Sequence, residues 1–368
     1  MSQSHLERIE LDLLRVPLKT PYKLVFGNVE AFDTLLVTVT LADGRSGVGE
    51  ATILTGYTEE TLEQCWQAAR AIGSELPGTR EGLVNGRLAP WLGENPFTVT
   101  AFSTAMEMAG GHAALRPTAA SVALLAILNE TEAGALDLEL ERLLQAGYST
   151  IKVKVGWNVQ DDLRRVRHIQ QALRGRARIR IDANQGYSKD DGCTFARSLD
   201  PTGIELLEQA CAAGDWDAAL AVKRTATVPI MLDESIYTMA DVEKAAALGA
   251  ADIIKLKLMK LGSIDQLEQA LGRIGALGMT AVLGNGVATE IGCWMEACVG
   301  AGLLATAGEM NGFLKQRSGL LTAPLRVQRG RILLDQAFRP RLDPKAVAAA
   351  RVGREEFYVA AGVGMTAP

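Results

Sequence analysis

The spacing of apolar and polar residues changes once along the chain, near residue 120. Before that point, residues 9–18 and 33–51 alternate apolar and polar positions, with an "ADG" turn inside the second stretch. This period-2 alternation predicts antiparallel strands joined by tight turns. Residues 58–76 and 95–115 have helical spacing instead. The pattern predicts a small α+β unit over residues 1–120.

From about residue 121, short apolar runs alternate with amphipathic helical patterns. The runs are "STIKVKV", "ARIRIDA", "GIELLEQ", "VPIMLDE", "ADIIKLKL", "MTAVLGN" and "LLATAGEM". Strands that alternate with helices, one unit every 25 residues or so, indicate a parallel sheet. At least seven consecutive units favour a closed barrel, although an open doubly wound sheet has the same pattern. We predict an α/β barrel over residues 121–320 and a segment, residues 321–368, that returns to the first unit.

Composition narrows the class of protein. The 48% of hydrophobic and 22% of charged residues are ordinary for a soluble globular chain. A net charge of −5, without a basic stripe, argues against nucleic-acid binding. No apolar run is long enough to span a membrane, and the start lacks a signal-peptide pattern. The five cysteines are dispersed without C-x-x-C spacing, so we expect reduced thiols and a cytoplasmic protein.

Charged residues end the apolar runs at a regular interval. In order along the chain they are Lys154, Asp182, Glu208, Asp233, Lys257 and Glu309. Their separations are 28, 26, 25, 24 and 52 residues, the last being two units. Each of these residues is therefore expected at the same height on a successive strand. Barrel enzymes carry their catalytic groups at this carboxyl end of the strands.

Three of these residues are acids on consecutive strands: Asp182, Glu208 and Asp233. Neighbouring strands lie about 5 Å apart, so the three carboxylates are expected to converge. Unpaired anions that close repel one another, and a divalent cation removes the repulsion. An all-oxygen ligand set suits Mg²⁺, with Mn²⁺ as the alternative. The other interpretation is that each acid caps a loop or forms an ion pair.

Two lysines flank the acids in sequence, and barrel closure would set Lys154 and Lys257 on opposite sides of the metal. A lysine that acts as a base near neutral pH needs its pKa lowered from about 10.4 to about 7–8. In "IKVKV", Lys152 shares a strand face with Lys154 and would push its pKa in that direction. In "IIKLKLMK", either Lys255 or Lys257 could point inward.

A metal between two lysines defines a reaction class. One lysine removes the proton alpha to a substrate carboxylate, the cation stabilises the enediolate, and the other lysine returns a proton from the opposite face. Racemisation or epimerisation follows from two bases on two faces. Cycloisomerisation or elimination requires only one base.

The motifs "KVKVG", "RIDANQGYS", "LLEQ", "IMLDES" and "IKLKLMKLGS", with "GRSGVGEAT" near the start, resemble the enolase superfamily. The resemblance is to its muconate-lactonizing subgroup, within the mandelate racemase/muconate lactonizing family, and extends over nearly the whole chain. It implies a modified (β/α)7β TIM-like barrel, with a capping α+β domain formed by both chain ends.

The resemblance also implies roles for single residues. Lys154 and Lys257 would be the acid/base pair, and Asp182, Glu208 and Asp233 the metal ligands. Further residues would contact the substrate or orient these groups: Lys152, Asn184, Glu234, Glu309 and, from a capping loop, Tyr57. We also expect a homo-oligomer, from a dimer to an octamer.

The substrate is expected to be a small carboxylate. The favoured hypothesis is an Mg²⁺-dependent racemase or epimerase of an N-substituted amino acid or dipeptide. The alternatives are a muconate-type cycloisomerase and a lyase similar to o-succinylbenzoate synthase. A metal-dependent hydrolase or aldolase is disfavoured because the chain has only three histidines. A non-catalytic binding protein is disfavoured because buried charges without a use are destabilising.

Overall fold

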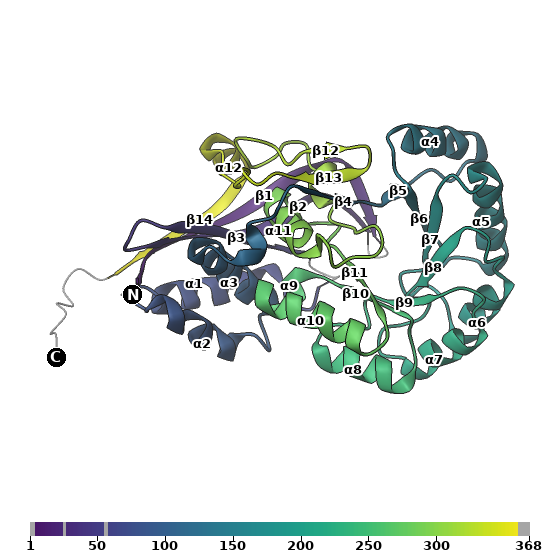
Figure 1. Cartoon of the computed structure of the whole chain (residues 1–368), viewed down its shortest axis with the longest axis horizontal. Coiled ribbons are helices and arrows are strands. Elements are labelled where there is room, and N and C mark those ends of the chain that lie inside the picture. The colour runs from purple at the N-terminus through teal and green to yellow at the C-terminus, as the bar shows by residue number, and fades with distance from the viewer. Residues whose placement is uncertain (1–3, 25–26, 55–57, 360–368) are drawn as a thin grey trace.

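Two β-sheets of different kinds organise the protein. The computed structural model describes residues 4–24, 27–54 and 58–359 (Figure 1). The first sheet is antiparallel, in the order β14 (Arg351–Tyr358), β1 (Leu6–Leu24), β2 (Gly27–Leu41) and β3 (Ser46–Ile53). The end of the chain therefore pairs with its beginning. The predicted antiparallel N-terminal unit is confirmed.

Helices cover one face of the antiparallel sheet. They are α1 (Leu62–Glu75), α2 (Val84–Leu88) and α3 (Pro96–Gly110). Leu35, Val37 and Val39 of β2 pack into the core under these helices, whereas Leu36 belongs to the core on the other face. α3 lies directly on β3, because a Cβ at Gly49 would come within 2.0 Å of the Ala101 carbonyl oxygen.

The second sheet is parallel and has seven strands in chain order. They are β5 (Ala126–Leu128), β6 (Thr150–Lys154), β7 (Arg178–Asp182), β8 (Ile204–Glu208), β9 (Ile230–Leu232), β10 (Ile253–Leu256) and β11 (Thr280–Leu283). The helices between and after them are α4 (Ala133–Gln145), α5 (Val159–Leu173), α6 (Lys189–Ser198), α7 (Trp216–Thr225), α8 (Met239–Leu248), α9 (Leu258–Leu261), α10 (Ile264–Ala276) and α11 (Glu290–Gly300). The strands curve inside the row of helices α4 to α8 (Figure 1). The predicted α/β class is confirmed.

The segment around Gly308 connects the two edges of this sheet. The Gly308 N–H donates to the Ala123 carbonyl at 2.8 Å, and its carbonyl accepts from the Leu125 N–H at 2.9 Å. On its other side, the Glu309 N–H donates to the Leu283 carbonyl at 3.0 Å. The segment therefore lies between the end of β11 and the residues that lead into β5.

Helix α5 illustrates how the outer layer forms. The Asn158 side chain caps its N-terminus by accepting hydrogen bonds from the N–H groups of Gln160 and Asp161. Leu163, Val166, Ile169 and Leu173 recur at helical spacing and are buried. They pack in one core with Ile151, Val153, Ile179 and Ile181 of β6 and β7. Burying each such side chain contributes about 1.5–3 kcal/mol.

The interior of the parallel sheet has two unlike halves. Four strands supply an apolar cluster: Leu206, Met231, Ile253 and Val282. On β6 and β7, the inward positions are instead the fully buried Lys152 and Arg180. Arg180 pairs with Glu205 at 2.9 Å, which a register shift between β7 and β8 allows.

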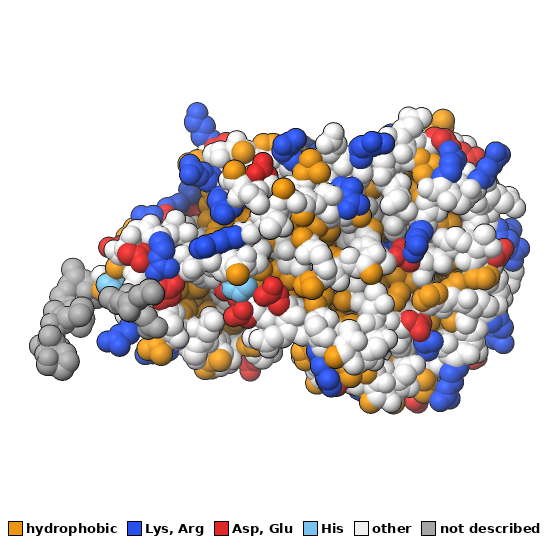
Figure 2. All heavy atoms as spheres, viewed as in Figure 1, with side chains coloured by type: hydrophobic (Ala, Val, Ile, Leu, Met, Phe, Trp, Pro, Cys, Tyr) orange, Lys and Arg blue, Asp and Glu red, His pale blue; other side chains and the backbone are white. Residues whose placement is uncertain are grey.

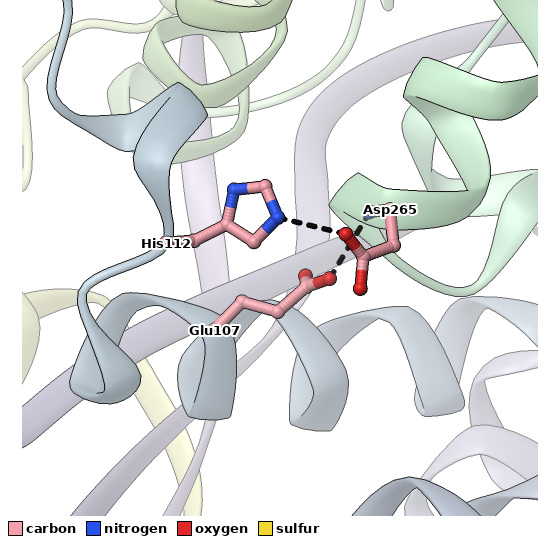
Figure 3. Close-up of side chains that lie close together, drawn as sticks. All are labelled: Glu107, His112 and Asp265. Carbon is pink, nitrogen blue, oxygen red and sulfur yellow. Dashed lines mark hydrogen bonds and ion pairs between the residues drawn. The ribbon is translucent and has the colours of Figure 1, made fainter.

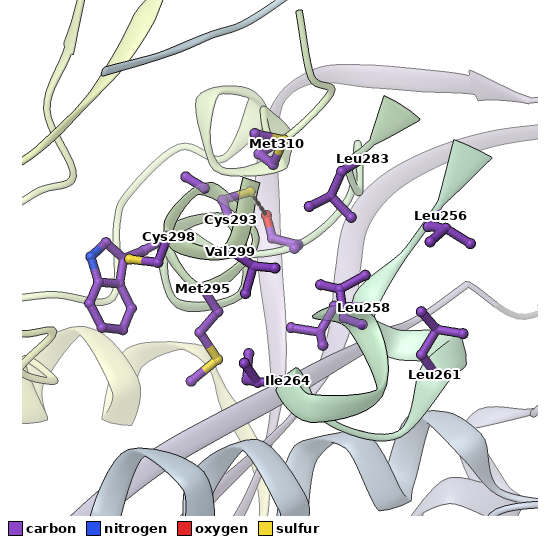
Figure 4. Packing of buried hydrophobic residues seen from close by; sticks show 14 of the residues in the cluster. Leu256, Leu258, Leu261, Ile264, Leu283, Cys293, Met295, Cys298, Val299 and Met310 are labelled. Atoms are coloured by element: carbon purple, nitrogen blue, oxygen red, sulfur yellow. Dashed lines mark hydrogen bonds between the residues drawn. The ribbon is translucent and has the colours of Figure 1, made fainter. Parts of the chain in front are cut away.

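Helix α11 joins the two units. All of its residues are buried. It contacts β3 of the first unit and the 3-10 turn Gly312–Lys315 that follows it. Figure 4 shows Val299 of α11 facing Leu258 and Leu283, and Met295 of the same helix pointing toward Ile264, all within one apolar core. A small antiparallel sheet of β12 (Val327–Gln328), β13 (Arg331–Leu334) and β4 (Ala120–Ala123), followed by α12 (Pro344–Ala350), completes the fold.

On the face drawn in Figure 2, basic side chains gather along the upper edge, in the region of α12, β12 and β13, and acidic side chains are scattered mainly over the middle. Within the described ranges, no helix has the length and apolar character that crossing a membrane requires.

Candidate active site

Most of the predicted charged residues line one cleft at the carboxyl ends of the parallel strands, and Glu208 contacts two of its lysines, Lys152 and Lys255. The strand register sets Lys154 opposite Asp182, and Asp182 opposite Glu208. Asp233 directly follows β9, and Lys257 directly follows β10. The N-terminal unit also lines the cleft, through Leu54 and Thr58. Tyr57, which was predicted to contact the substrate, lies outside the described residues.

Lys152 and Lys154, which we call the β6 wall, share Asp182 Oδ2 but otherwise contact different groups. The Lys152 Nζ lies 2.8 Å from both Asp182 Oδ2 and Glu208 Oε2, and 3.1 Å from Glu309 Oε2. Burial alone would lower the pKa of Lys152, but these carboxylates raise it above its ordinary value. Three carboxylates therefore neutralise the ammonium group of Lys152, whose positive charge was expected to lower the pKa of Lys154.

Lys154 is oriented by a chain of polar contacts. Its Nζ lies 2.7 Å from Asp182 Oδ2 and also donates to Asn184 Oδ1. The Asn184 amide donates to Glu234 Oε1 at 2.9 Å, and its backbone N–H donates to Asp182 Oδ1 at 2.9 Å. Asn184 has a φ of 41°, a left-handed conformation that asparagine tolerates. The side chain of Lys154 is 26% exposed, so its amine is accessible from the cleft.

Lys255 and Lys257, which we call the β10 wall, lie across the cleft, with β7, β8 and β9 between the two walls. The Lys257 Nζ lies 2.7 Å from Asp233 Oδ1 and 3.0 Å from Asp233 Oδ2. The side chain of Lys257 is 7% exposed. The two predicted acid/base lysines therefore face the acids from opposite sides.

Lys255 was not among the predicted site residues, yet it also points inward. Its Nζ lies 3.0 Å from Glu208 Oε1, 3.1 Å from Asp233 Oδ2 and 2.6 Å from Glu309 Oε2. Burial opposes its charge, but the carboxylates, Asp233 first, raise its pKa well above the ordinary value. The sequence did contain a clue: Lys255 and Lys257 are two residues apart, like Lys152 and Lys154, so both side chains of each pair point to the same face of their strand.

Asp182, Glu208 and Asp233 suit a hard divalent cation. All three are buried, and they offer only oxygen ligands. Glu208 Oε2 and Asp233 Oδ1 are buried without accepting a hydrogen bond, although a lysine Nζ lies 2.8 and 2.7 Å from them. Burial and the charge of Asp182 raise the pKa of Glu208 to about 7. A cation would relieve this penalty.

Gln209, which the sequence analysis did not single out, holds two strand ends together. Its Oε1 accepts hydrogen bonds from the N–H groups of Asp233 (3.0 Å) and Ser235 (3.1 Å). Its Nε2 donates to Ser235 Oγ at 2.7 Å. The backbone orientation of Asp233 therefore depends on the residue after Glu208. Nothing in the spacing of residues along the chain distinguishes this glutamine from an ordinary residue at the end of a strand.

A second group of ligand-type side chains lies away from the cleft, where α3 meets α10 (Figure 3). Glu107, His112 and Asp265 are close enough to share a metal ion. However, Glu107 accepts hydrogen bonds from the N–H groups of Ile264 and Asp265, at the positive end of the α10 dipole. His112 accepts from the Ala114 N–H through Nδ1, which leaves Nε2 to donate to Asp265. These contacts connect the two units and disfavour a cation there.

Comparisons with known proteins identify the family of the chain. The model of the "Enolase C-terminal domain-like" family matches residues 135–340. The L-Lys-D/L-Arg epimerase of Methylococcus capsulatus is 31% identical over 307 residues, 76% of this chain and 80% of that protein. Muconate cycloisomerase 1-2 of Acinetobacter lwoffii is 29% identical over 357 residues, 88% and 89% of the two chains.

A solved structure has the same fold. It is the dipeptide epimerase from Cytophaga hutchinsonii complexed with Mg and the dipeptide D-Ala-L-Val. Its TM-score is 0.86 at 21% identity, and the match covers 96% of this chain and 100% of that one.

Proposed function

The chain belongs to the enolase superfamily, as an isomerase with an enolase C-terminal domain-like region, and on this premise we propose that it racemises or epimerises an N-substituted amino acid or dipeptide. The observation that carries the proposal is the placement of Lys154 and Lys257 on opposite sides of three buried acids.

The two lysines exchange roles according to the substrate enantiomer. A neutral Nζ on one side takes the α-proton, and the ammonium on the other side donates a proton to the opposite face of the α-carbon. Configuration at that carbon is then inverted, and the lysines regain their initial protonation by exchange with solvent. Such general acid–base catalysis contributes about 10²–10⁴-fold to rate.

Other residues hold these groups in place. Asn184 and Glu234 orient Lys154, and Gln209 orients Asp233. Superfamily members use a divalent metal, and we propose Mg²⁺ or Mn²⁺ held by Asp182, Glu208 and Asp233. When bound, the cation supplies positive charge that favours the enediolate form of the substrate carboxylate.

The finer architecture also belongs to the proposal. The hydrogen bonds around Gly308 support an eighth strand position, and with it a (β/α)7β barrel. The pairing of β14 with β1 supports a capping domain built from residues 1–120 and 321–368, over a barrel domain of residues 121–320. A homo-oligomeric, cytoplasmic enzyme remains our prediction.

Deuterium exchange in D₂O tests the reaction. Both enantiomers of a panel of N-acyl amino acids and dipeptides are incubated with the enzyme and Mg²⁺, and α-deuterium is measured by mass spectrometry. We expect incorporation from both enantiomers. Incorporation from one enantiomer alone would refute the two-base proposal.

A muconate-type cycloisomerase is the second candidate, because the relative from Acinetobacter lwoffii matches a larger share of this chain than the epimerase does. Loss of the ultraviolet absorbance of cis,cis-muconate, without α-proton exchange from amino acid derivatives, would favour it. A lyase similar to o-succinylbenzoate synthase is the remaining alternative, and it would release water from its substrate.

A further inference from the structure

Glu309 is the acid of the cleft that lies outside the proposed metal ligands. It comes after α11 in the chain and beside the end of β11 in space, lines the cleft and is 5% exposed. One of its oxygens, Oε2, lies 2.6 Å from the Lys255 Nζ and 3.1 Å from the Lys152 Nζ. Two buried ammonium groups, one from each wall, therefore share a single carboxylate.

The second oxygen of Glu309 and the amine of Lys315 both lie beside Gly286. Glu309 Oε1 and the Lys315 Nζ each lie 3.3 Å from the position that a Cβ on Gly286 would take. The Lys315 Nζ is held there by hydrogen bonds to the Gly286 carbonyl and, at 3.1 Å, to Asn311 Oδ1. Glu309 is thus paired with two lysines, and the amine of Lys315 is held by other oxygens on the Gly286 side of the cleft.

Binding of a metal ion would leave Glu309 paired with Lys152 and Lys255, so Glu309 would not become available to another cation. Lys152 and Lys255 share Asp182, Glu208 and Asp233 with the proposed metal. A dication on those three acids would compete with the lysines there, whereas Glu309 would remain their counterion. Among the described residues that line the cleft, no acid is then left to receive an ammonium group of a substrate.

From these contacts we infer that the group on the substrate's amino nitrogen carries no positive charge. An N-acyl amino acid with an uncharged or anionic acyl group fits, and a dipeptide with a free N-terminal ammonium does not. The inference rests on the proposed function and selects one substrate class within it. Lys255 is the specificity-determining residue, because it neutralises Glu309 from the β10 wall.

A matched pair of substrates tests the inference. L-alanyl-L-leucine and N-propionyl-L-leucine differ only by the ammonium group, and the same pair is made for glutamate, arginine and phenylalanine in place of leucine. The holoenzyme's kcat/KM for α-deuterium exchange is measured for each. We expect the propionyl compound to be favoured at least about tenfold, mainly through KM. Preference for the dipeptides would overturn the inference and leave the proposed function intact.

Two variants separate the roles of the lysine and the acid. Lys255→Met is expected to reduce the preference about tenfold by leaving Glu309 with one cation fewer, whereas Lys223→Met, at a partly exposed pair with Asp252, leaves it unchanged. Because Lys255→Met can fail to fold, Glu309→Gln provides an independent test.

A selective loss of dipeptide exchange in Glu309→Gln would show that Glu309 receives the N-terminal ammonium group of the dipeptide, and would overturn the inference. Exchange from neither class would refute the proposed function, and this inference with it.

Discussion

The β6 wall and the β10 wall have the same lysine spacing but different surroundings. In each wall, the deeper lysine (Lys152 or Lys255) shares Glu208 and Glu309 with its counterpart. The outer lysines differ: Lys154 is 26% exposed, and Lys257 is 7% exposed. The deeper pair therefore balances buried charge, and the outer pair is left for proton transfer.

A second difference lies three residues beyond each outer lysine. After Lys154 this position is Trp157, which is exposed. After Lys257 it is Lys260, whose Nζ donates to the Ile236 carbonyl at 2.8 Å and lies 4.5 Å from the centre of the Tyr237 ring. The β10 wall thus carries one more partly buried charge than the β6 wall, so the two walls should respond differently to substitution.

The largest effect is expected when the outer lysines are replaced one at a time. Lys154→Met and Lys257→Met should each reduce racemisation about 10²–10⁴-fold, because each removes the acid or base of one face. Each variant should still exchange the α-proton of one enantiomer, and the two variants should retain opposite enantiomers. Loss of exchange from the same enantiomer in both would mean that the lysines do not serve opposite faces.

The deeper lysines should matter for stability. Lys152→Met is expected to lower the free energy of unfolding by about 3–5 kcal/mol in metal-free buffer, because Asp182, Glu208 and Glu309 then lose a shared buried counterion. Urea denaturation measures the change. Lys223→Met, at a partly exposed ion pair, is the control and should change the free energy of unfolding by less than about 1 kcal/mol. Equal values for the two variants would contradict a charge-balancing role.

Binding of Mg²⁺ to the three acids between the walls should raise the stability of the folded protein. Mg²⁺ at 100 times its Kd is expected to stabilise the folded protein by about 2.7 kcal/mol, visible as a higher Tm. Asp233→Asn should abolish the shift. Asp265→Asn, in the cluster of Figure 3, should preserve it. The reverse result would move the metal site to the junction of α3 and α10.

A pH-dependent effect on stability is expected from Lys260. Burial and the nearby Lys257 lower the pKa of Lys260 from 10.5 to about 8. Between about pH 8 and 10.5 the unfolded chain binds a proton at this lysine that the folded chain does not, so the wild type should gain stability relative to Lys260→Met as the pH rises. Below about pH 8 the difference should be constant. Urea denaturation across this range measures it, and Trp157→Ala should show no such pH dependence.

Much of the site could be predicted because the relevant information is local. Period-2 alternation gives the face of each residue within a strand, and the carboxyl ends of parallel strands share one edge of the sheet. The regular spacing from Lys154 to Lys257 was therefore enough to group the three acids between two lysines. Lys255 was missed because only one of Lys255 and Lys257 was expected to point inward. Residues two apart on a strand share a face, and in the structure both point inward.

By itself, the sequence determined the class of the fold, the order of its strands and the height of each charged residue, because these follow from patterns repeated within single βα units. Only the tertiary structure decided which charges share a partner. Glu309 meets Lys152 and Lys255 from distant strands because the segment around Gly308 lies between β11 and the start of β5. Contacts across a curved sheet depend on its closure and register, and no local pattern encodes them.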